Sequence, residues 1–66
     1  MNDLFFELIR VGLGLSKTIN KVPSYVEWMK LYEISREHTL TGVFINAVQI
    51  LYQDSRYSSS IDKIFS

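Results

Sequence analysis

The sequence predicts an all-α protein, a small three-helix bundle that forms a single domain over residues 1–66. Apolar residues recur at three- and four-residue spacings along most of the chain, which is the period of an α-helix. Ser24 and Glu27 have the spacing of an N-terminal capping box. The alternation of apolar and polar residues that marks a half-buried strand is missing. Together these observations favour helices and give no signal for a sheet.

The first predicted helix covers about residues 3–14, with Asn2 or Asp3 as its cap. Its apolar arc spans more than half of the helix circumference, which is wider than a single covering layer needs. We therefore expect this helix to be covered on two sides. The candidate residues for contact with a partner are Leu4, Phe5, Phe6 and Leu13, to which Leu15 adds further apolar surface.

The second predicted helix covers about residues 24–38 and begins after Val22-Pro23, because the residue before proline is pushed towards extended geometry. Trp28 and Leu31 lie on one side of it, and Lys30 and Glu33 on the other. Tryptophan buries a large area, so we predict that Trp28 anchors the core. Its alternative role is a platform for a ligand or partner.

The third predicted helix covers about residues 40–53 and has a broad apolar face with an uncharged polar stripe. Such a helix is central in its domain or faces another protein. The segment from Asp54 to Ser60 is typical of a loop. A short fourth helix or turn at residues 60–65 is suggested by the helical spacing of Ile61, Ile64 and Phe65.

Length, charge and cysteine content exclude several classes of protein. A chain of 66 residues buries only about 60% of its unfolded surface, which favours support from a partner. Seven basic and seven acidic residues are scattered along the chain, which argues against binding nucleic acid. The charge-free run at residues 39–53 is shorter than the ~20 residues that span a bilayer. Charges interrupt the apolar N-terminal segment, unlike a signal peptide, and we expect a cytoplasmic protein without membrane contact.

The residues that carry catalysis or bind metals are sparse. With one histidine and no cysteine, we expect no catalytic site, no metal, no cofactor and no small-molecule ligand. Glu33 and Glu37 share a helix face, but Lys30 and Arg36 flank them, so we interpret the group as an ion-paired surface rather than a carboxylate pair. His38 is expected to cap the end of its helix rather than to act as a general base.

One resemblance to a known family extends over residues 2–51. The runs NDLFFELIRVGLG and PSYVEWMKLYEISREHTLTGVFINAVQIL resemble the N-terminal helical segment of Bacteroidetes proteins classed as uncharacterised nucleotidyltransferases. The matching residues are Phe5, Leu8, Trp28, Leu31, Ser35, His38, Gly42 and Val43. The resemblance implies a catalytic domain with a G-S or G-G turn and a pair of metal-binding acids. The chain lacks these motifs, so the transferase activity is not carried over to it.

Two functions follow as hypotheses. The first is a protein-interaction or oligomerisation module, not an enzyme, which binds another copy of itself or another protein or domain. The alternative is an N-terminal helical fragment that supports a nucleotidyltransferase-like enzyme whose catalytic domain is missing here. The excess apolar surface of the first helix has two explanations that remain open. Either a two-fold homodimer covers it, or Ile61, Ile64 and Phe65 fold back over it within one chain.

Overall fold

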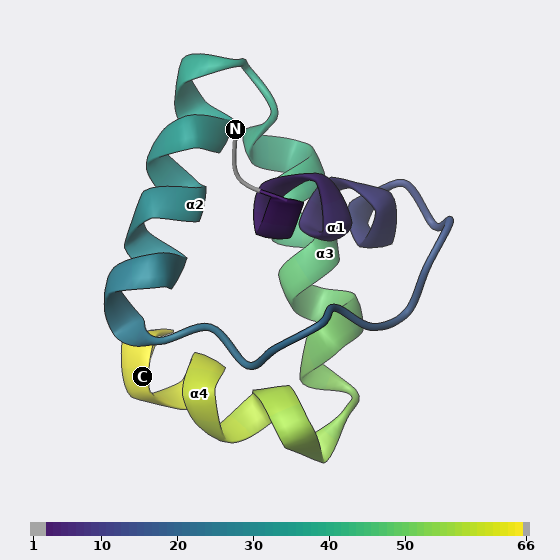
Figure 1. The fold of residues 1–66 in the computed structure, drawn as a ribbon, viewed down its shortest axis with the longest axis vertical. Helices are drawn as coiled ribbons and strands as arrows, with labels where there is room; N and C mark the ends of the chain where they lie inside the picture. The colour runs from purple at the N-terminus through teal and green to yellow at the C-terminus, as the bar shows by residue number, and fades with distance from the viewer. Residues whose placement is uncertain (1–2, 66) are drawn as a thin grey trace.

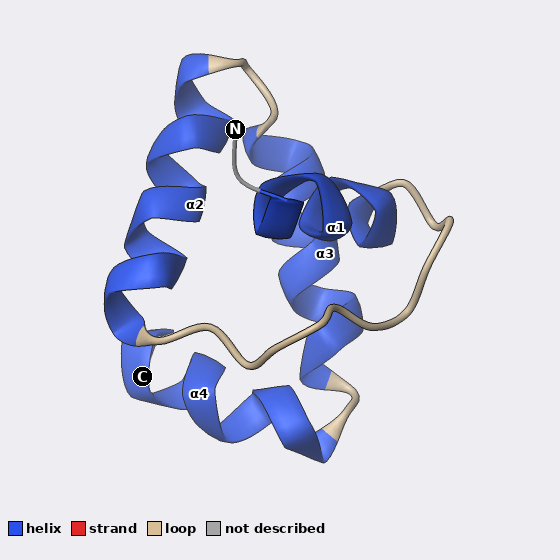
Figure 2. Cartoon of the chain, viewed as in Figure 1, coloured by secondary structure: helices blue, strands red, loops and turns tan. Residues whose placement is uncertain are grey.

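The computed structural model describes residues 3–65, and within this range the chain forms four α-helices and no strand (Figure 1, Figure 2). The helices are α1 (Asp3–Gly12), α2 (Tyr25–Glu37), α3 (Thr41–Tyr52) and α4 (Ser55–Phe65). The all-α prediction is confirmed, and the first three helices lie within two residues of their predicted bounds. The prediction allowed a short fourth helix at the C-terminus, and α4 is that helix, although with 11 residues it begins earlier and is longer than the turn expected at residues 60–65.

Helix α3 lies at the centre of the fold and contacts each of the other three helices. Figure 1 shows α2 and α3 side by side, joined by a short turn, with α4 across their lower ends. Helix α1 lies across α3 on the side that faces the viewer, and the long α1–α2 loop passes around the molecule to reach α2. The central place of the third helix agrees with its broad apolar face.

A single hydrophobic core receives side chains from all four helices and from the α1–α2 loop. Its buried members are Leu4, Phe5, Leu8, Val11, Ile19, Trp28, Leu31, Phe44, Ala47, Leu51, Tyr57 and Ile61. Trp28 is 1% exposed and meets the Phe44 ring edge-on, with 6.3 Å between the ring centroids. The predicted core role of Trp28 is therefore confirmed. None of the helices in residues 3–65 has both the length and the apolar character needed to cross a membrane.

Helix α1 and helix α3 are in close contact at Gly12. A Cβ atom at this position would lie 2.3 Å from the Val43 carbonyl oxygen and 2.5 Å from Val43 Cγ1. Asn46 Nδ2 of α3 donates a hydrogen bond of 2.8 Å to the Gly12 carbonyl oxygen, one of the acceptors that the end of α1 leaves without a helical partner. The crossing therefore needs glycine at position 12.

Helix α1 ends in a Schellman motif around Gly14. The Gly14 N–H donates to the Val11 carbonyl and the Leu15 N–H to the Arg10 carbonyl, both at 2.9 Å. Gly14 has a φ of 81°, which glycine adopts at little cost. The first helix therefore ends in this region, as predicted, because Gly14 adopts a left-handed conformation that cannot continue the helix.

Helix α2 begins and ends with two different caps. At its start, the Glu27 N–H donates to Ser24 Oγ at 3.3 Å and the Ser24 N–H to Glu27 Oε1 at 2.9 Å, which confirms the capping box. At its end, Thr39 occupies the left-handed position of a second Schellman motif, with a φ of 59°. A β-branched residue is strained in this conformation.

The α1–α2 loop is held by side chains of α1 and α4, and Trp28 of α2 bonds one of them. Tyr57 of α4 bonds both backbone groups of Ile19. Trp28 Nε1 donates to Ser60 Oγ at 2.9 Å, and the Ser60 hydroxyl donates to the carbonyl oxygen of the buried Pro23 at 2.8 Å. Glu7 of α1 adds an acceptor for backbone and side chain of Asn20. These bonds allow a long irregular segment to pack against the core.

The prediction of a loop over Asp54–Ser60 is wrong, because Ser55–Ser60 belong to α4. Asp54 precedes the helix, and its Oδ1 accepts the Arg56 N–H at 2.9 Å, which is the bond of an N-cap residue. Tyr57 and Ile61, four residues apart, are buried in the core, and Ile64 is partly buried. Burial of this stripe explains why a serine-rich segment is helical. The predicted contribution of Phe65 lies outside the described side chains.

Candidate functional site

The residues predicted as a partner interface divide into two groups. Leu4 and Phe5 are 7% and 4% exposed and belong to the core, so they do not lie on an accessible surface as that prediction required. Phe6 and Leu13 are 52% and 58% exposed. The physical reason is the crossing with α3, which turns one side of the wide apolar arc inward and leaves the adjacent side in water.

The exposed side of the first helix has a simple composition. Asp3, Phe6, Arg10 and Leu13 are all exposed and follow the spacing i, i+3, i+7 and i+10, so they form one stripe; we call these four residues the α1 outer face. Leu13 continues the helical path, because its N–H still donates to the Ile9 carbonyl at 2.9 Å. Leu15, which is 65% exposed, extends the apolar surface just beyond the helix.

Sequence reasoning missed a second exposed apolar group, on α2. Tyr25, Val26 and Met29 point away from the core, opposite Trp28 and Leu31. The signal was present in the helical period, because Val26 and Met29 are three residues apart and both lie at least 100° around the helix from Trp28. Helix α2 presents charged residues further along its exposed surface at Lys30, Glu33, Arg36 and Glu37.

The carboxylates of Glu33 and Glu37 lie on the exposed surface of α2. Glu33, Arg36 and Glu37 line an open surface hollow of ≈ 330 Å³. The ion pairing predicted for this group is not formed, since the ion pairs of residues 3–65 are Lys21–Glu27 and Asp54–Arg56. Arg36 lies over the Tyr32 ring instead, 5.9 Å from its centroid. Within the described chain no three side chains of histidine, cysteine, aspartate or glutamate are placed to hold a metal ion.

His38 occupies the C-cap position of α2 and is exposed. Its backbone N–H donates to the Ile34 carbonyl at 3.1 Å. Its ring lies 6.2 Å from the Phe5 ring, centroid to centroid, and has no hydrogen-bond partner within residues 3–65. The predicted side-chain bond to an end carbonyl is therefore not formed, and neither is the carboxylate contact that orients a general base.

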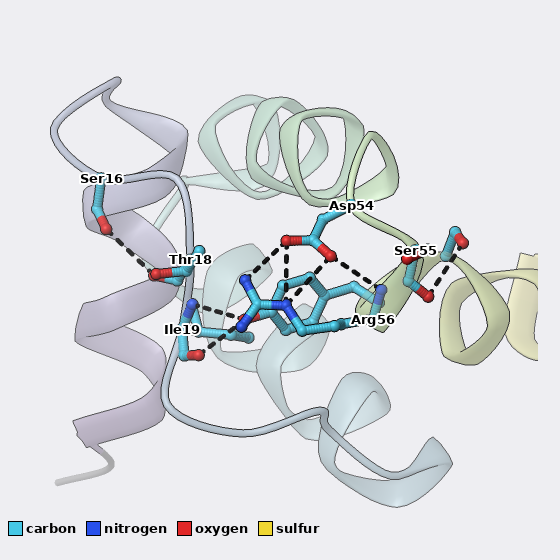
Figure 3. Close-up of polar contacts among 8 residues, drawn as sticks. Ser16, Thr18, Ile19, Asp54, Ser55 and Arg56 are labelled. Atoms are coloured by element: carbon cyan, nitrogen blue, oxygen red, sulfur yellow. Dashed lines mark hydrogen bonds and ion pairs between the residues drawn. The ribbon is translucent and has the colours of Figure 1, made fainter.

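A larger hollow, ≈ 560 Å³, lies where the α1–α2 loop meets the start of α4, lined in part by Lys17, Gln53 and Asp54. Figure 3 shows the Arg56 guanidinium facing the carboxylate of Asp54, one of these lining residues. Arg56 Nη2 lies 2.7 Å from Asp54 Oδ2, and this bond holds the pKa of the Asp54 carboxyl below its usual value. Because Asp54 already occupies the positive end of α4, an anion gains little there.

The exposed tyrosine of α3 makes one bond to α4. Tyr52 donates its hydroxyl hydrogen to Asp62 Oδ1 at 2.5 Å, and this bond raises the pKa of Tyr52. A tyrosine whose pKa is raised is less able to act as a base or nucleophile near neutral pH. The contact therefore joins α3 to α4.

Comparison of the chain with protein-family models, with curated proteins and with solved structures found no match. The fold and the surface describe the chain as a small all-α domain whose α1 helix exposes a stripe of alternating charged and apolar residues. The resemblance to nucleotidyltransferase N-terminal segments stays a prediction.

Proposed function

We propose that this chain is a protein-interaction module, not an enzyme, and that the α1 outer face is its binding surface. The observation that carries this proposal is the exposure of Phe6 and Leu13 on a helix whose opposite side is fully packed. Exposed apolar side chains that gather on one side of a small domain are typical of protein–protein contact sites. Leu15 enlarges the apolar area of the surface.

The distribution of polar groups supports the same proposal. The buried polar side chains that the core does contain serve the fold: Ser35 Oγ donates to the Leu31 carbonyl at 2.8 Å, and Tyr57 bonds Ile19. The two hollows described above are open and lie beside carboxylates that already have structural roles or face solvent. A cytoplasmic location is part of the proposal.

Energetics favour a contact that covers this surface. Burying apolar area contributes about 25 cal/mol per Å², so covering two or three half-exposed side chains contributes a few kcal/mol. A chain of 66 residues has a small stability margin, and this amount is a large fraction of it. Binding would therefore stabilise the folded state as well as form a complex.

Site-specific photocrosslinking tests the proposal. A benzoylphenylalanine is incorporated in place of Phe6 or, as a matched control on the exposed apolar surface of α2, in place of Val26. Irradiation of cells that produce the chain should give a protein adduct from position 6 and little from position 26. The adduct should be lost when Leu13→Glu is added. Equal adducts from both positions, or none from position 6, would reject the α1 outer face as the binding surface.

A further inference from the structure

The two charges of the α1 outer face lie at its opposite ends and have opposite signs. Asp3 is in the first turn of α1 and Arg10 in the last. Seven residues separate them, which corresponds to about 10 Å along the axis and only about 20° around it. Both side chains are exposed, and neither forms an ion pair or side-chain hydrogen bond within residues 3–65. Phe6 lies between them, close to the midpoint of the stripe.

We infer that the α1 outer face binds the same face of a second copy of this chain, with the two α1 helices antiparallel; this rests on the proposed function. A two-fold axis through the midpoint between residues 3 and 10 brings Asp3 of each copy opposite Arg10 of the other. The same axis places the two Phe6 rings side by side at the centre. One surface thus supplies both halves of an isologous contact.

The charge pattern selects this orientation over the parallel one. In a parallel pair, Asp3 would lie beside Asp3 and Arg10 beside Arg10 at the same height, and like charges at such positions are destabilising. In the antiparallel pair the same four charges form two attractive contacts. The stripe therefore also favours a second copy over an unrelated protein, because its charges are complementary to themselves after a two-fold rotation.

The area of the α1 outer face sets the expected affinity of the dimer. A stable interface buries about 800 Å² per partner, which is a sizeable part of the 4346 Å² that this chain exposes. In this register Phe6 is the central apolar residue, whereas Leu13 and Leu15 lie beyond the start of the facing α1 helix, so the contact is at the lower end of that scale. We therefore expect a weak, reversible dimer that forms at micromolar concentrations or above.

Charge reversal combined with sedimentation tests the antiparallel pairing. The purified wild type is compared with Asp3→Arg, with Arg10→Asp and with the variant that carries both changes, from about 1 μM to about 1 mM. Each single change converts both attractive contacts to repulsive ones, and dimerisation should weaken by at least about tenfold. The double variant should dimerise again. So should an equimolar mixture of the two single variants, in which each contact pairs opposite charges.

Controls keep loss of folding apart from loss of pairing. Each single change also opposes the helix dipole, so helicity is followed by circular dichroism. The double variant carries both changes, and its recovery would exclude unfolding as the cause. Val26→Glu, on the exposed surface of α2, should leave the dimer intact.

Two results would overturn the inference: a wild type that stays monomeric over the whole range, or single variants that dimerise as well as the wild type does. A monomeric wild type together with a crosslink from position 6 to a different protein would retain the proposed function and reject self-pairing. A wild type that dimerises without any response to charge reversal would reject the antiparallel register.

Discussion

Tyr57 of α4 holds both backbone polar groups of Ile19 in the α1–α2 loop. Its hydroxyl donates to the Ile19 carbonyl oxygen at 2.8 Å and accepts the Ile19 N–H at 3.2 Å. Both residues are buried, so these two bonds replace the water that the loop backbone would otherwise need. The last helix of the chain thus fixes the first loop, 38 residues earlier in the sequence.

Replacing this hydroxyl should therefore destabilise the fold. Tyr57→Phe keeps the ring but leaves the Ile19 N–H and carbonyl buried without a partner, which should lower the free energy of unfolding by about 1–3 kcal/mol. Urea denaturation measures the change. Tyr52→Phe is the matched control, because the Tyr52 hydroxyl bonds Asp62 at the surface, and its effect should be smaller. Equal losses for the two variants would contradict the role assigned to Tyr57.

Substitutions in the two Schellman motifs should have opposite effects on stability: Thr39→Gly should stabilise the fold and Gly14→Ala should destabilise it. Thr39→Gly removes the strain of a β-branched residue with a φ of 59°, and the relief of about 1–2 kcal/mol exceeds the entropic cost of glycine. We expect a gain of about 0.5–1 kcal/mol in thermal or chemical denaturation. Gly14→Ala should cost about 1 kcal/mol although the space around it is open, because its φ is 81°. A destabilised Thr39→Gly variant would show that the threonine side chain stabilises the turn.

A methyl group at Gly12 should disrupt the contact between α1 and α3. In Gly12→Ala the new Cβ would overlap the Val43 carbonyl oxygen, a backbone atom that cannot rotate away, so we expect a loss of about 1–3 kcal/mol or more. Gly42→Ala is the control: Gly42 lies in helix α3, and a Cβ atom there would meet no heavy atom within 4 Å apart from its chain neighbours and the backbone of its own helix, so the change should stabilise by up to about 1 kcal/mol. Denaturation curves with equal shifts for both variants would exclude a tight crossing at residue 12.

The carboxylate of Asp54 should contribute stability that acid removes. Its pKa is lowered from 3.8 by hydrogen bonds from the Arg56 side chain and backbone. A carboxyl whose pKa is lower in the folded state than in the unfolded state stabilises the fold. This contribution is fully present when the pH is above the unfolded-state pKa, and it is lost as the pH falls through the folded-state pKa. Asp54→Asn keeps a good N-cap but removes the charge. The stability difference between wild type and variant should thus be positive at neutral pH and shrink below pH 3.8. A difference that stays constant with pH would contradict this assignment.

Local sequence determined those parts of the fold whose causes lie within a few residues. The capping box of Ser24 and Glu27 satisfies backbone donors at the start of α2 wherever that helix packs. Gly14 ends α1 because the turn needs a positive φ. The helical period fixed the core position of Trp28 in the same way, since a residue this large on the apolar side of a helix is packed inward.

Tertiary structure decided whether α4 forms and which side of α1 is buried. The segment after Asp54 is rich in serine, a residue that competes with helical hydrogen bonds, and it is helical because Tyr57 and Ile61 pack against the rest of the core. The apolar arc of α1 offers two nearly equivalent sides, so its sequence alone cannot choose between them. The choice depends on where two backbones can approach closely, and that place is Gly12 against Val43, which buries Leu4 and Phe5 and leaves Phe6 exposed.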